Sequence, residues 1–222
     1  MAQPTLAALE AFDHASEEHD GIGDADTQRV ATKFREFMEA LGLDLTDPNL
    51  SGTDRRVARA FRELFAGHYA GREPDLRTFP NAEGYRETVT VTDVPFHSIC
   101  AHHFLPFFGS AHLAYQPKDR LVGLSKLVRV VDYYARRPQL QERMTEQIAE
   151  LIEGRLRPAG AMVVIQARHF CMEMRGVAKA GLTTTTTAVR GAFEDEAVRR
   201  KLHVLLARGR WTPGVALPLG EG

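Results

Sequence analysis

The spacing of hydrophobic residues changes twice along this chain of 222 residues, and this change restricts the possible folds more than any other feature. Residues 85–96 and 109–117 alternate hydrophobic and polar positions, as half-buried strands do. Residues 121–156 show helical spacing, and residues 161–170 and 182–191 favour strands again. Two hairpins separated by a helix pair predict an α+β domain, with an antiparallel four-stranded sheet in ββααββ order and helices on one face.

Two helices are expected before this region. The first extends from Thr27, which is suited to cap it, to about Gly42, and the second begins near Thr53. Helical spacing gives the first helix one apolar face, formed by Val30, Phe34, Phe37, Met38 and Leu41. The second helix has a basic face, formed by Arg55, Arg56, Arg59 and Arg62. This face is a solvated surface unless an anion is placed there, and residues 71–84 are expected to form a loop.

The charge distribution sets the first 26 residues apart from the rest. They carry seven acidic side chains and no Lys or Arg, whereas the remaining chain holds 28 basic against 22 acidic residues. We expect residues 1–26 to be a flexible tail, 27–84 a helical region, 85–208 the main domain and 209–222 a flexible end. The positive charge of the remaining chain is compatible with an anionic ligand but does not identify one.

The composition of the chain indicates the cellular compartment in which the protein is expected. No apolar run approaches the roughly 18 residues that a membrane-spanning helix needs. The N-terminus also lacks the basic region that precedes the apolar part of a secretion signal. We therefore expect a cytoplasmic protein without membrane association. Cys100 and Cys171 are the only cysteines, and in a reducing compartment such a pair is more often two buried thiols or two metal ligands than a disulfide.

The first cysteine belongs to a motif with metal-ligand spacing. Cys100 and His103 are spaced C-x-x-H, so that one tight turn can direct a thiolate and an imidazole at the same ion. Together with Cys171, which follows a predicted strand, they form a donor set suited to zinc, with one tetrahedral position left for water. His102 and His169 lie close to these residues in sequence. They are either proton-transfer groups or hydrogen-bonded structural histidines.

A second group of polar residues lies on the predicted helix pair. Ser125, Lys126 and Arg129 are near the start of the first of these helices, where a hydroxyl and two cations suit phosphate groups. Arg175, soon after Cys171, adds a planar donor that could bind phosphate in a bidentate manner. Glu142 either accepts two N–H groups from a guanine edge or forms an ion pair with a nearby arginine.

Three sequence blocks, "CAHHFLPFFG", "GLSKLVRVVDYYARRPQLQERMTEQIA" and "HFCMEMRGV", resemble the GTP cyclohydrolase I family in their order and spacing. The resemblance covers roughly residues 27–207. It implies a tunnelling fold, with residues 85–208 as the catalytic domain and with sheets from several subunits closing into a β-barrel. It further implies a homodecamer of two pentameric rings with active sites between subunits, an arrangement that would cover exposed sheet edges.

The resemblance also assigns roles to residues. It implies Zn²⁺ as the cofactor, bound by Cys100, His103 and Cys171, with His102 and His169 as the catalytic histidines. It implies that Gln141 and Glu142 belong to the segment that holds the guanine of GTP, with Glu142 as the main anchor. The residues that match the triphosphate contacts of the family are Ser125, Lys126, Arg129, Arg175 and Arg56.

The implied reaction is the zinc-dependent hydrolytic opening of the GTP imidazole ring. It releases formate and forms 7,8-dihydroneopterin triphosphate, the first step of tetrahydrofolate and pterin biosynthesis. His102 is expected to transfer protons at the purine ring, and His169 at the ring and the ribose. No nucleic-acid partner is expected, because the basic face of the arginine-rich helix carries no base-stacking aromatic residues.

The chain departs from the family pattern at Ala101, where members usually have glutamate. A carboxylate beside a metal site often orients a histidine, so a weaker site is conceivable. Asp54 replaces a common proline, which changes little because aspartate suits the first turn of a helix. Two alternatives remain: another tunnelling-fold enzyme acting on a related purine or pterin, and a zinc-stabilised binding protein without turnover.

Overall fold

The computed structural model describes residues 24–69 and 73–207. The chain divides into two compact units, residues 1–63 and 64–222. The first unit contains helix α2 (Asp24–Ala40), the short 3-10 helix η2 (Pro48–Leu50) and all but the last residue of helix α3 (Thr53–Leu64). The predicted C-terminal end and all but the last few residues of the predicted acidic tail lie outside the described residues.

Helix α2 differs from its prediction in two respects. It begins at Asp24, before the expected cap Thr27. Its expected apolar face is only partly buried in this chain, since Met38 is buried but Val30, Phe37 and Leu41 are 46%, 55% and 60% exposed. Ala31, which lies outside the expected face, is also buried. Helical spacing shows that a face is suited to burial, but it does not show whether the same chain covers it.

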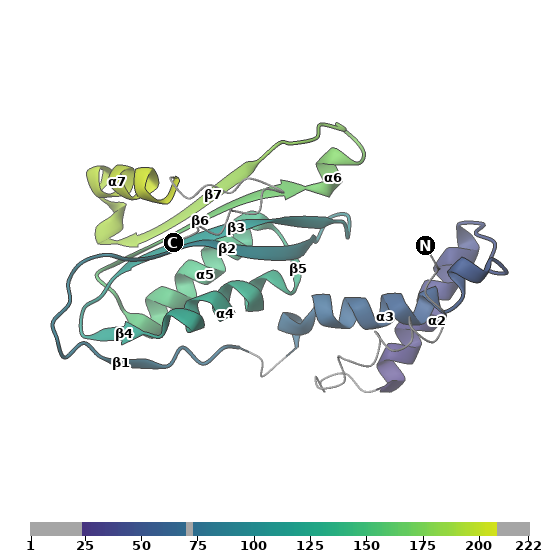
Figure 1. The fold of residues 1–222 in the computed structure, drawn as a ribbon, viewed down its shortest axis with the longest axis horizontal. Coiled ribbons are helices and arrows are strands. Elements are labelled where there is room, and N and C mark those ends of the chain that lie inside the picture. The colour runs from purple at the N-terminus through teal and green to yellow at the C-terminus, as the bar shows by residue number, and fades with distance from the viewer. Residues whose placement is uncertain (1–23, 70–72, 208–222) are drawn as a thin grey trace, which may run out of the picture. The chain divides into compact units, whose positions relative to one another are not determined.

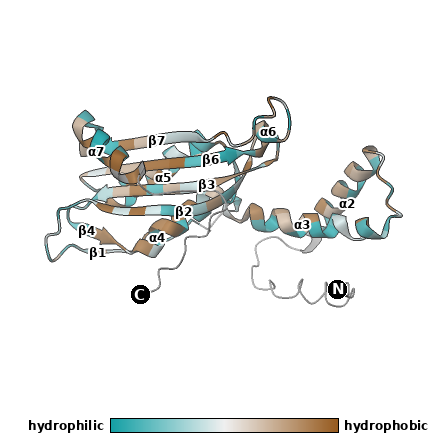
Figure 2. Ribbon diagram, turned by 45° about the horizontal axis from the view of Figure 1, so that its top comes forward, coloured by the Kyte–Doolittle hydropathy of each residue, from teal (hydrophilic) through white to brown (hydrophobic). Residues whose placement is uncertain are grey.

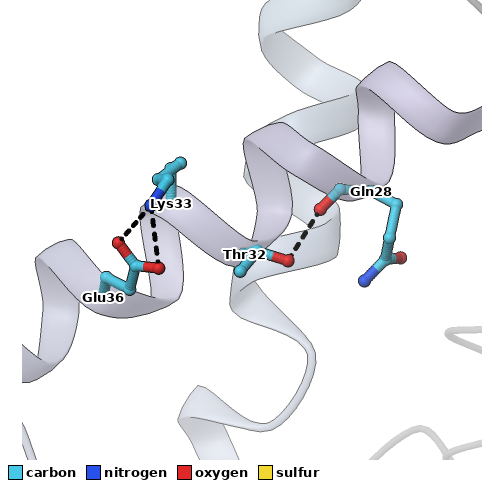
Figure 3. Close-up of polar contacts among 4 residues, drawn as sticks. All are labelled: Gln28, Thr32, Lys33 and Glu36. Carbon is cyan, nitrogen blue, oxygen red and sulfur yellow. Dashed lines mark hydrogen bonds and ion pairs between the residues drawn. The ribbon is translucent and has the colours of Figure 1, made fainter.

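The polar side of α2 is stabilised by contacts within the helix (Figure 3). Lys33 forms an ion pair with Glu36, three residues further on, with 2.8 Å between Nζ and Oε2. The Thr32 hydroxyl donates to the carbonyl oxygen of Gln28 at 3.0 Å. Such exposed pairs contribute only a few tenths of a kcal/mol each. The stability of this helix must therefore come mainly from packing.

The second unit follows the predicted order of elements. After the 3-10 helix η3 (Ala66–His68), it consists of β1 (Thr78–Pro80), β2 (Val89–Cys100), β3 (Pro106–Gln116), β4 (Arg120–Val122), α4 (Leu124–Ala135), β5 (Pro138–Gln139), α5 (Gln141–Leu156), β6 (Gly160–His169), α6 (Phe170–Glu173), β7 (Thr184–Gly191), η4 (Ala192–Glu194) and α7 (Glu196–Ala207). The two long hairpins and the helix pair between them are confirmed. Among the described residues no helix is both long and apolar enough to cross a membrane.

The main sheet has the order β5-β2-β3-β6-β7. Its four long strands pair antiparallel, as predicted, and the two-residue strand β5 adds a parallel pairing at the end of β2. At the centre, β3 pairs with β6 over ten residue pairs, from Phe107–His169 to Gln116–Gly160. This register brings the end of β6 beside the start of β3, so it also brings together the segments that carry the two cysteines.

Helices cover both faces of this sheet (Figure 1). Helices α4 and α5 pack on one face through the larger core, which includes Leu127, Ile148 and Ile165. Helix α7 packs on the opposite face through a smaller core that includes Met162 and Leu206. Figure 2 shows the hydrophobic residues concentrated on these strands and helices. Successive strand residues point to opposite faces, so β6 contributes to both cores.

The segment expected to be a loop at residues 71–84 contains a strand. Residues Thr78–Pro80 form β1, which pairs antiparallel with β4 (Arg120–Val122). Arg120 strengthens the pair, because its Nε donates to the Thr78 hydroxyl at 2.6 Å and its Nη2 to the Thr78 carbonyl at 3.0 Å. Three residues are too few to show a period, and the partner strand is about forty residues away, so local spacing cannot reveal this pairing.

His112 is a buried titratable residue in the centre of β3. It is 1% exposed, and its Nδ1 accepts a hydrogen bond from the backbone N–H of Asp93 at 3.2 Å. Its Nε2 has no hydrogen-bond partner among the described residues. Burial lowers the pKa of His112 below its ordinary value, and the nearby Asp93 only partly offsets this effect. The folded protein therefore holds this imidazole neutral near pH 7.

We expect His112 to make the protein less stable in acid. The unfolded chain takes up a proton at this imidazole below about pH 6.5, whereas in the folded chain the imidazole stays neutral to lower pH. The free energy of unfolding therefore decreases as the pH falls from about 6.5 toward the lower pKa of the folded state. Urea unfolding at fixed protein concentration, compared between wild type and His112→Gln, measures this effect. The stability of wild type relative to the variant should decrease on acidification, and parallel pH profiles would contradict the prediction.

Candidate active site

Cys100, His103 and Cys171 meet at one end of the sheet. Their ligand atoms all lie within 4.8 Å of one another, so the three residues could hold a metal ion. The two sulfur atoms are 3.9 Å apart, far beyond the roughly 2.05 Å of a disulfide bond, and both cysteines are free. The predicted metal ligands are thus brought together by the fold, from two hairpins that are distant in sequence.

The turn between β2 and β3 places the first two of these residues. Ile99 pairs with Pro106, so the intervening residues form the hairpin turn. Two 2.9 Å hydrogen bonds close it, from the Cys100 N–H to the Leu105 carbonyl and from the Phe104 N–H to the Cys100 carbonyl. Phe104 has a positive φ of 54°, and its ring packs edge-on against Phe65 with centroids 5.7 Å apart. This sharp turn directs Cys100 and His103 to the same side.

Cys171 comes from the short helix α6, which follows β6 directly. Arg168 and Glu173 lie on either side of Cys171 in sequence and form an ion pair. The distance between Arg168 Nε and Glu173 Oε1 is 2.7 Å, and a second contact joins Nη2 to Oε2. Arg168 also lies over the ring of Phe108 on β3, 5.9 Å from its centroid. The ion pair thus closes the segment that contains Cys171 and ties it to the neighbouring strand.

Electrostatics keep the Cys171 thiol protonated in the metal-free chain. Burial raises the pKa of Cys171, and the adjacent Cys100 raises it further, because two thiolates would repel each other. A divalent cation between the sulfur atoms would reverse this effect, since a metal ligand binds as the thiolate. Metal binding at this group is therefore expected to release protons.

His169 is the last residue of β6 and is held on two sides. Its ring stacks on Phe107, with parallel planes and centroids 4.8 Å apart. Its Nε2 lies 2.7 Å from Oε1 of Gln141 on α5. Burial lowers the pKa of His169, and the charge of Glu142 acts in the opposite direction. This imidazole is therefore fixed in orientation beside the metal-ligand group, as a proton-transfer residue would need to be.

The other candidate histidine is more exposed. His102 and His103 are consecutive in the turn, and their rings are nearly perpendicular, with centroids 6.1 Å apart. Both side chains are exposed in the isolated chain. His102 is thus available to a substrate in front of the turn, while His103 belongs to the metal-ligand group.

The predicted guanine-binding residues have different environments. Gln141 is buried, and its side chain is engaged in hydrogen bonds within the protein. Glu142 is exposed in the first turn of α5. A helix turns by about 100° per residue, so neighbouring residues on α5 point in different directions. In the isolated chain, the Glu142 side chain is accessible from solvent and the Gln141 side chain is not.

The predicted phosphate-binding residues lie on different elements of the chain. Ser125 and Arg129 are exposed and Lys126 is partly buried, all near the N-terminus of α4. Arg175 is exposed and follows α6 by two residues, and α6 lies at the end of the sheet away from the start of α4 (Figure 1). Arg56 belongs to the first unit, where its guanidinium donates to the Ser51 carbonyl at 2.9 Å and the Thr53 hydroxyl at 2.8 Å.

Comparison with known proteins identifies the family. A family model described as GTP cyclohydrolase I matches residues 30–207. The curated GTP cyclohydrolase 1 of Clostridioides difficile (strain 630) is 47% identical over 176 residues, covering 79% of this chain and 93% of that protein. The GTP cyclohydrolase 1 of Mycobacterium tuberculosis (strain H37Rv) is 48% identical over 177 residues, 79% of this chain and 87% of that one. The chain belongs to the GTP cyclohydrolase I family.

Another relative and one solved structure are also similar to this chain. The GTP cyclohydrolase 1 of Pelotomaculum thermopropionicum is 46% identical over 186 residues, covering 83% of this chain and 98% of that protein. Among solved structures, the apo form of the archaeosine synthase QueF-Like matches 49% of this chain and 95% of its own, with a TM-score of 0.38 and 15% identity. That likeness is too distant to support an argument about the site.

The unusual Ala101 of this GTP cyclohydrolase I family member has a role that does not involve its side chain. Its backbone N–H donates to the Gln139 carbonyl at 2.9 Å and so attaches the metal-ligand turn to β5. Any residue except proline could make this bond. The turn therefore keeps its main-chain support whether position 101 carries alanine or glutamate.

Sequence reasoning missed the ion pair between Arg168 and Glu173. The arginine and the glutamate are five residues apart, one at the end of a strand and the other in the following helix. No sequence pattern predicts an ion pair between two such positions. The arginine hydrogen bond lowers the pKa of Glu173, so the carboxylate stays ionised well into the acid range. The two side chains are 23% and 7% exposed.

We expect Arg168→Met to weaken metal binding, because the segment that carries Cys171 loses its closing contact. Partners that orient metal ligands typically change affinity by about 10–100-fold, and we expect the low end of this range. Cd²⁺ titration followed by thiolate-to-metal absorption measures it. Arg190→Met is the matched control, since Arg190 pairs with Glu146 and Glu153, away from the cysteines. Equal Cd²⁺ affinity in wild type and Arg168→Met would refute the role of the pair.

Proposed function

We propose that this chain is a GTP cyclohydrolase I, which opens the imidazole ring of GTP by hydrolysis and releases formate to form 7,8-dihydroneopterin triphosphate. The main support is the assembly of Cys100, His103 and Cys171 beside His169 in a member of this family. Neither a binding protein nor a purely structural metal site needs an oriented, half-buried imidazole next to the metal ligands.

Zinc is the metal that we propose for this group. Two thiolates and one imidazole are donors that suit Zn²⁺, and three protein ligands are typical of catalytic zinc sites. In tetrahedral coordination, Zn–S bonds of about 2.3 Å put two sulfur atoms about 3.8 Å apart. The observed separation of 3.9 Å fits this value without rearrangement. When bound, zinc supplies Lewis-acid chemistry and lowers the pKa of a coordinated water.

The histidines would move the protons of the reaction. Opening the purine ring requires protonation of a ring nitrogen, and rearrangement of the ribose requires further transfers. We assign transfer at the purine ring to His102, which is exposed in the turn, and transfers at the ring and ribose to His169. Glu142, exposed in the first turn of α5, would hold the guanine edge.

The triphosphate residues support a site shared between subunits. Helix α4 ends at Ala135, next to β5, which pairs with Ile99 and Cys100. Ser125 is ten residues earlier on this helix, roughly 15 Å away along its axis. One chain thus presents its metal-ligand group and the start of α4 at opposite ends of the sheet (Figure 1). We propose that Ser125, Lys126 and Arg129 contact the triphosphate held by a neighbouring subunit.

An oligomer would also account for surfaces that one chain leaves open. The apolar residues Val30, Phe37 and Leu41 of α2 are exposed, and β7 is an edge strand of the main sheet. Apolar patches and unpaired strand edges are common sites of subunit association. We propose the homodecamer of two pentameric rings, with Arg56 near a neighbouring triphosphate. The cytoplasmic location and the absence of a nucleic-acid partner stay predictions.

We expect purified protein to contain about one Zn²⁺ per chain and to release formate from GTP, with loss of turnover on chelation and recovery on zinc addition. His169→Ala should keep zinc but lose at least about 100-fold in kcat, as expected for a general acid–base residue. Formate release and fluorescence of the oxidised pterin product measure turnover. Zinc-loaded protein that binds GTP without producing formate would contradict the proposed activity.

A mixing experiment tests the shared site. Lys126→Ala and His169→Ala should each lose most activity alone. If one subunit supplies Lys126 and its neighbour His169, random mixed oligomers from co-expression contain about a quarter of intact sites. GTP turnover of co-expressed, co-purified variants measures this recovery. Absence of recovery in confirmed mixed oligomers would show that both residues serve the same chain's site.

A further inference from the structure

The side chain of Gln141 occupies a buried position between α5 and the second hairpin. Gln141 is the first residue of α5 and is 2% exposed. Its Nε2 lies 3.0 Å from the carbonyl oxygen of Ile165 on β6 and 3.0 Å from that of Thr184 on β7. The hydroxyl oxygen of Thr186 lies 3.1 Å away. The amide nitrogen is therefore surrounded by acceptors from both strands.

These neighbours determine which way the amide group faces. A backbone carbonyl oxygen can only accept hydrogen bonds, so the NH₂ end must face Ile165 and Thr184. The reversed amide would direct its own oxygen at two carbonyl oxygens, which is strongly unfavourable in a buried site. The amide oxygen of Gln141 must consequently face His169, whose Nε2 lies 2.7 Å away.

Two threonines complete a directed ring of hydrogen bonds. The Thr145 hydroxyl is 2.7 Å from the backbone carbonyl oxygen of Gln141, to which it must donate. Thr145 has only one hydroxyl hydrogen, so the 2.6 Å contact between Thr145 and Thr186 is donated by Thr186. Toward the Gln141 amide nitrogen Thr186 can then only accept, and the two amide hydrogens are shared among three acceptors. The directions of these hydrogen bonds are mutually consistent and hold the amide in one orientation.

The ring in turn fixes the hydrogen on His169. Because Oε1 of Gln141 can only accept, Nε2 of His169 must carry a hydrogen. The neutral imidazole therefore has its lone pair on Nδ1, and any proton is gained or lost at that nitrogen. Stacking on Phe107, at 4.8 Å between centroids, sets the plane of the same ring. Position, plane and tautomer are thus all determined by residues outside the metal-ligand group.

We infer that Gln141 is a positioning residue, which holds His169 in the Nε2–H tautomer with Nδ1 as its only proton-accepting atom. This inference rests on the proposed role of His169 in proton transfer. It replaces the expectation that the Gln141 side chain holds the guanine. A buried amide whose NH₂ already has three acceptors within 3.1 Å cannot bind a substrate without breaking those bonds. Guanine recognition falls instead to the adjacent, exposed Glu142.

The tautomer can be measured directly on the zinc-loaded wild-type protein. In histidine labelled with ¹⁵N, the chemical shift separates a protonated ring nitrogen from a bare one, and coupling to the ring Hδ2 identifies Nε2. Signals that disappear in His169→Ala belong to His169. We expect a protonated Nε2 and a bare Nδ1 near neutral pH. A His169 that carries its hydrogen on Nδ1 alone would overturn the inference, whether or not any Gln141 variant folds.

Substitution separates positioning from substrate contact. Gln141→Met keeps the length of the side chain but cannot accept from His169. We expect kcat to fall about 10–100-fold, as for other groups that orient a histidine, with KM for GTP changed less than about threefold. The His169 ring should lose its uniform Nε2–H state. A raised KM with unchanged kcat and tautomer would instead identify Gln141 as a substrate contact and overturn the inference.

A second pair of variants acts through the threonine ring. Thr186→Val removes the hydroxyl that accepts from Gln141, whereas Thr186→Ser keeps it. We expect a smaller fall in kcat for Thr186→Val, with Thr186→Ser close to wild type and KM unaffected in both. Turnover of His169→Ala at the wild-type rate would refute the proposed role of His169, while the tautomer measurement would still decide whether Gln141 fixes that ring.

Discussion

The pairing of β3 with β6 is the constraint on which the rest of the second unit depends. Its register places Phe107 opposite His169, so that the turn after β2 and the helix after β6 lie at the same end of the sheet. A shift by one residue would turn every side chain of β6 to the other face. Both cores would then lose their contacts, and Cys171 would move away from Cys100. Burial on both faces therefore stabilises the geometry of the site.

Buried residues of α5, β6 and β7 also support the site. Helix α5 begins with a buried glutamine that reaches across β6 to β7, and its amide is fixed by backbone carbonyls and by a ring with two threonines. Buried polar networks of this kind are stable only when every member is satisfied, and a satisfied network defines one arrangement. His169 is the one member of this network that also borders the metal-ligand group. A rigid interior thus sets the orientation of a residue that must act on a substrate.

Much of this arrangement could be predicted from local sequence patterns. The alternation of residues 85–96 indicated strand β2, which begins and ends four residues later (Val89–Cys100), and the helical spacing of residues 121–156 indicated helices α4 and α5. The C-x-x-H spacing of Cys100 and His103 correctly indicated one turn with two ligand atoms on the same side. The helical spacing of α2 also predicted a buried apolar face. That prediction was only partly right for the single chain, since Met38 is buried but Val30, Phe37 and Leu41 are exposed, because spacing says nothing about what packs on a face.

By itself, the sequence determined the long strands and helices and the kinds of donor atoms available for a metal, because hydrophobic period, turn residues and ligand spacing act over a few neighbours. Only the tertiary structure decided which of these donors meet and what holds them. The strand β1, the pair of Arg168 with Glu173 and the burial of Gln141 have no local signal. They result from the register of strands that are distant in sequence, and from the requirement that buried polar groups find partners wherever the fold provides them.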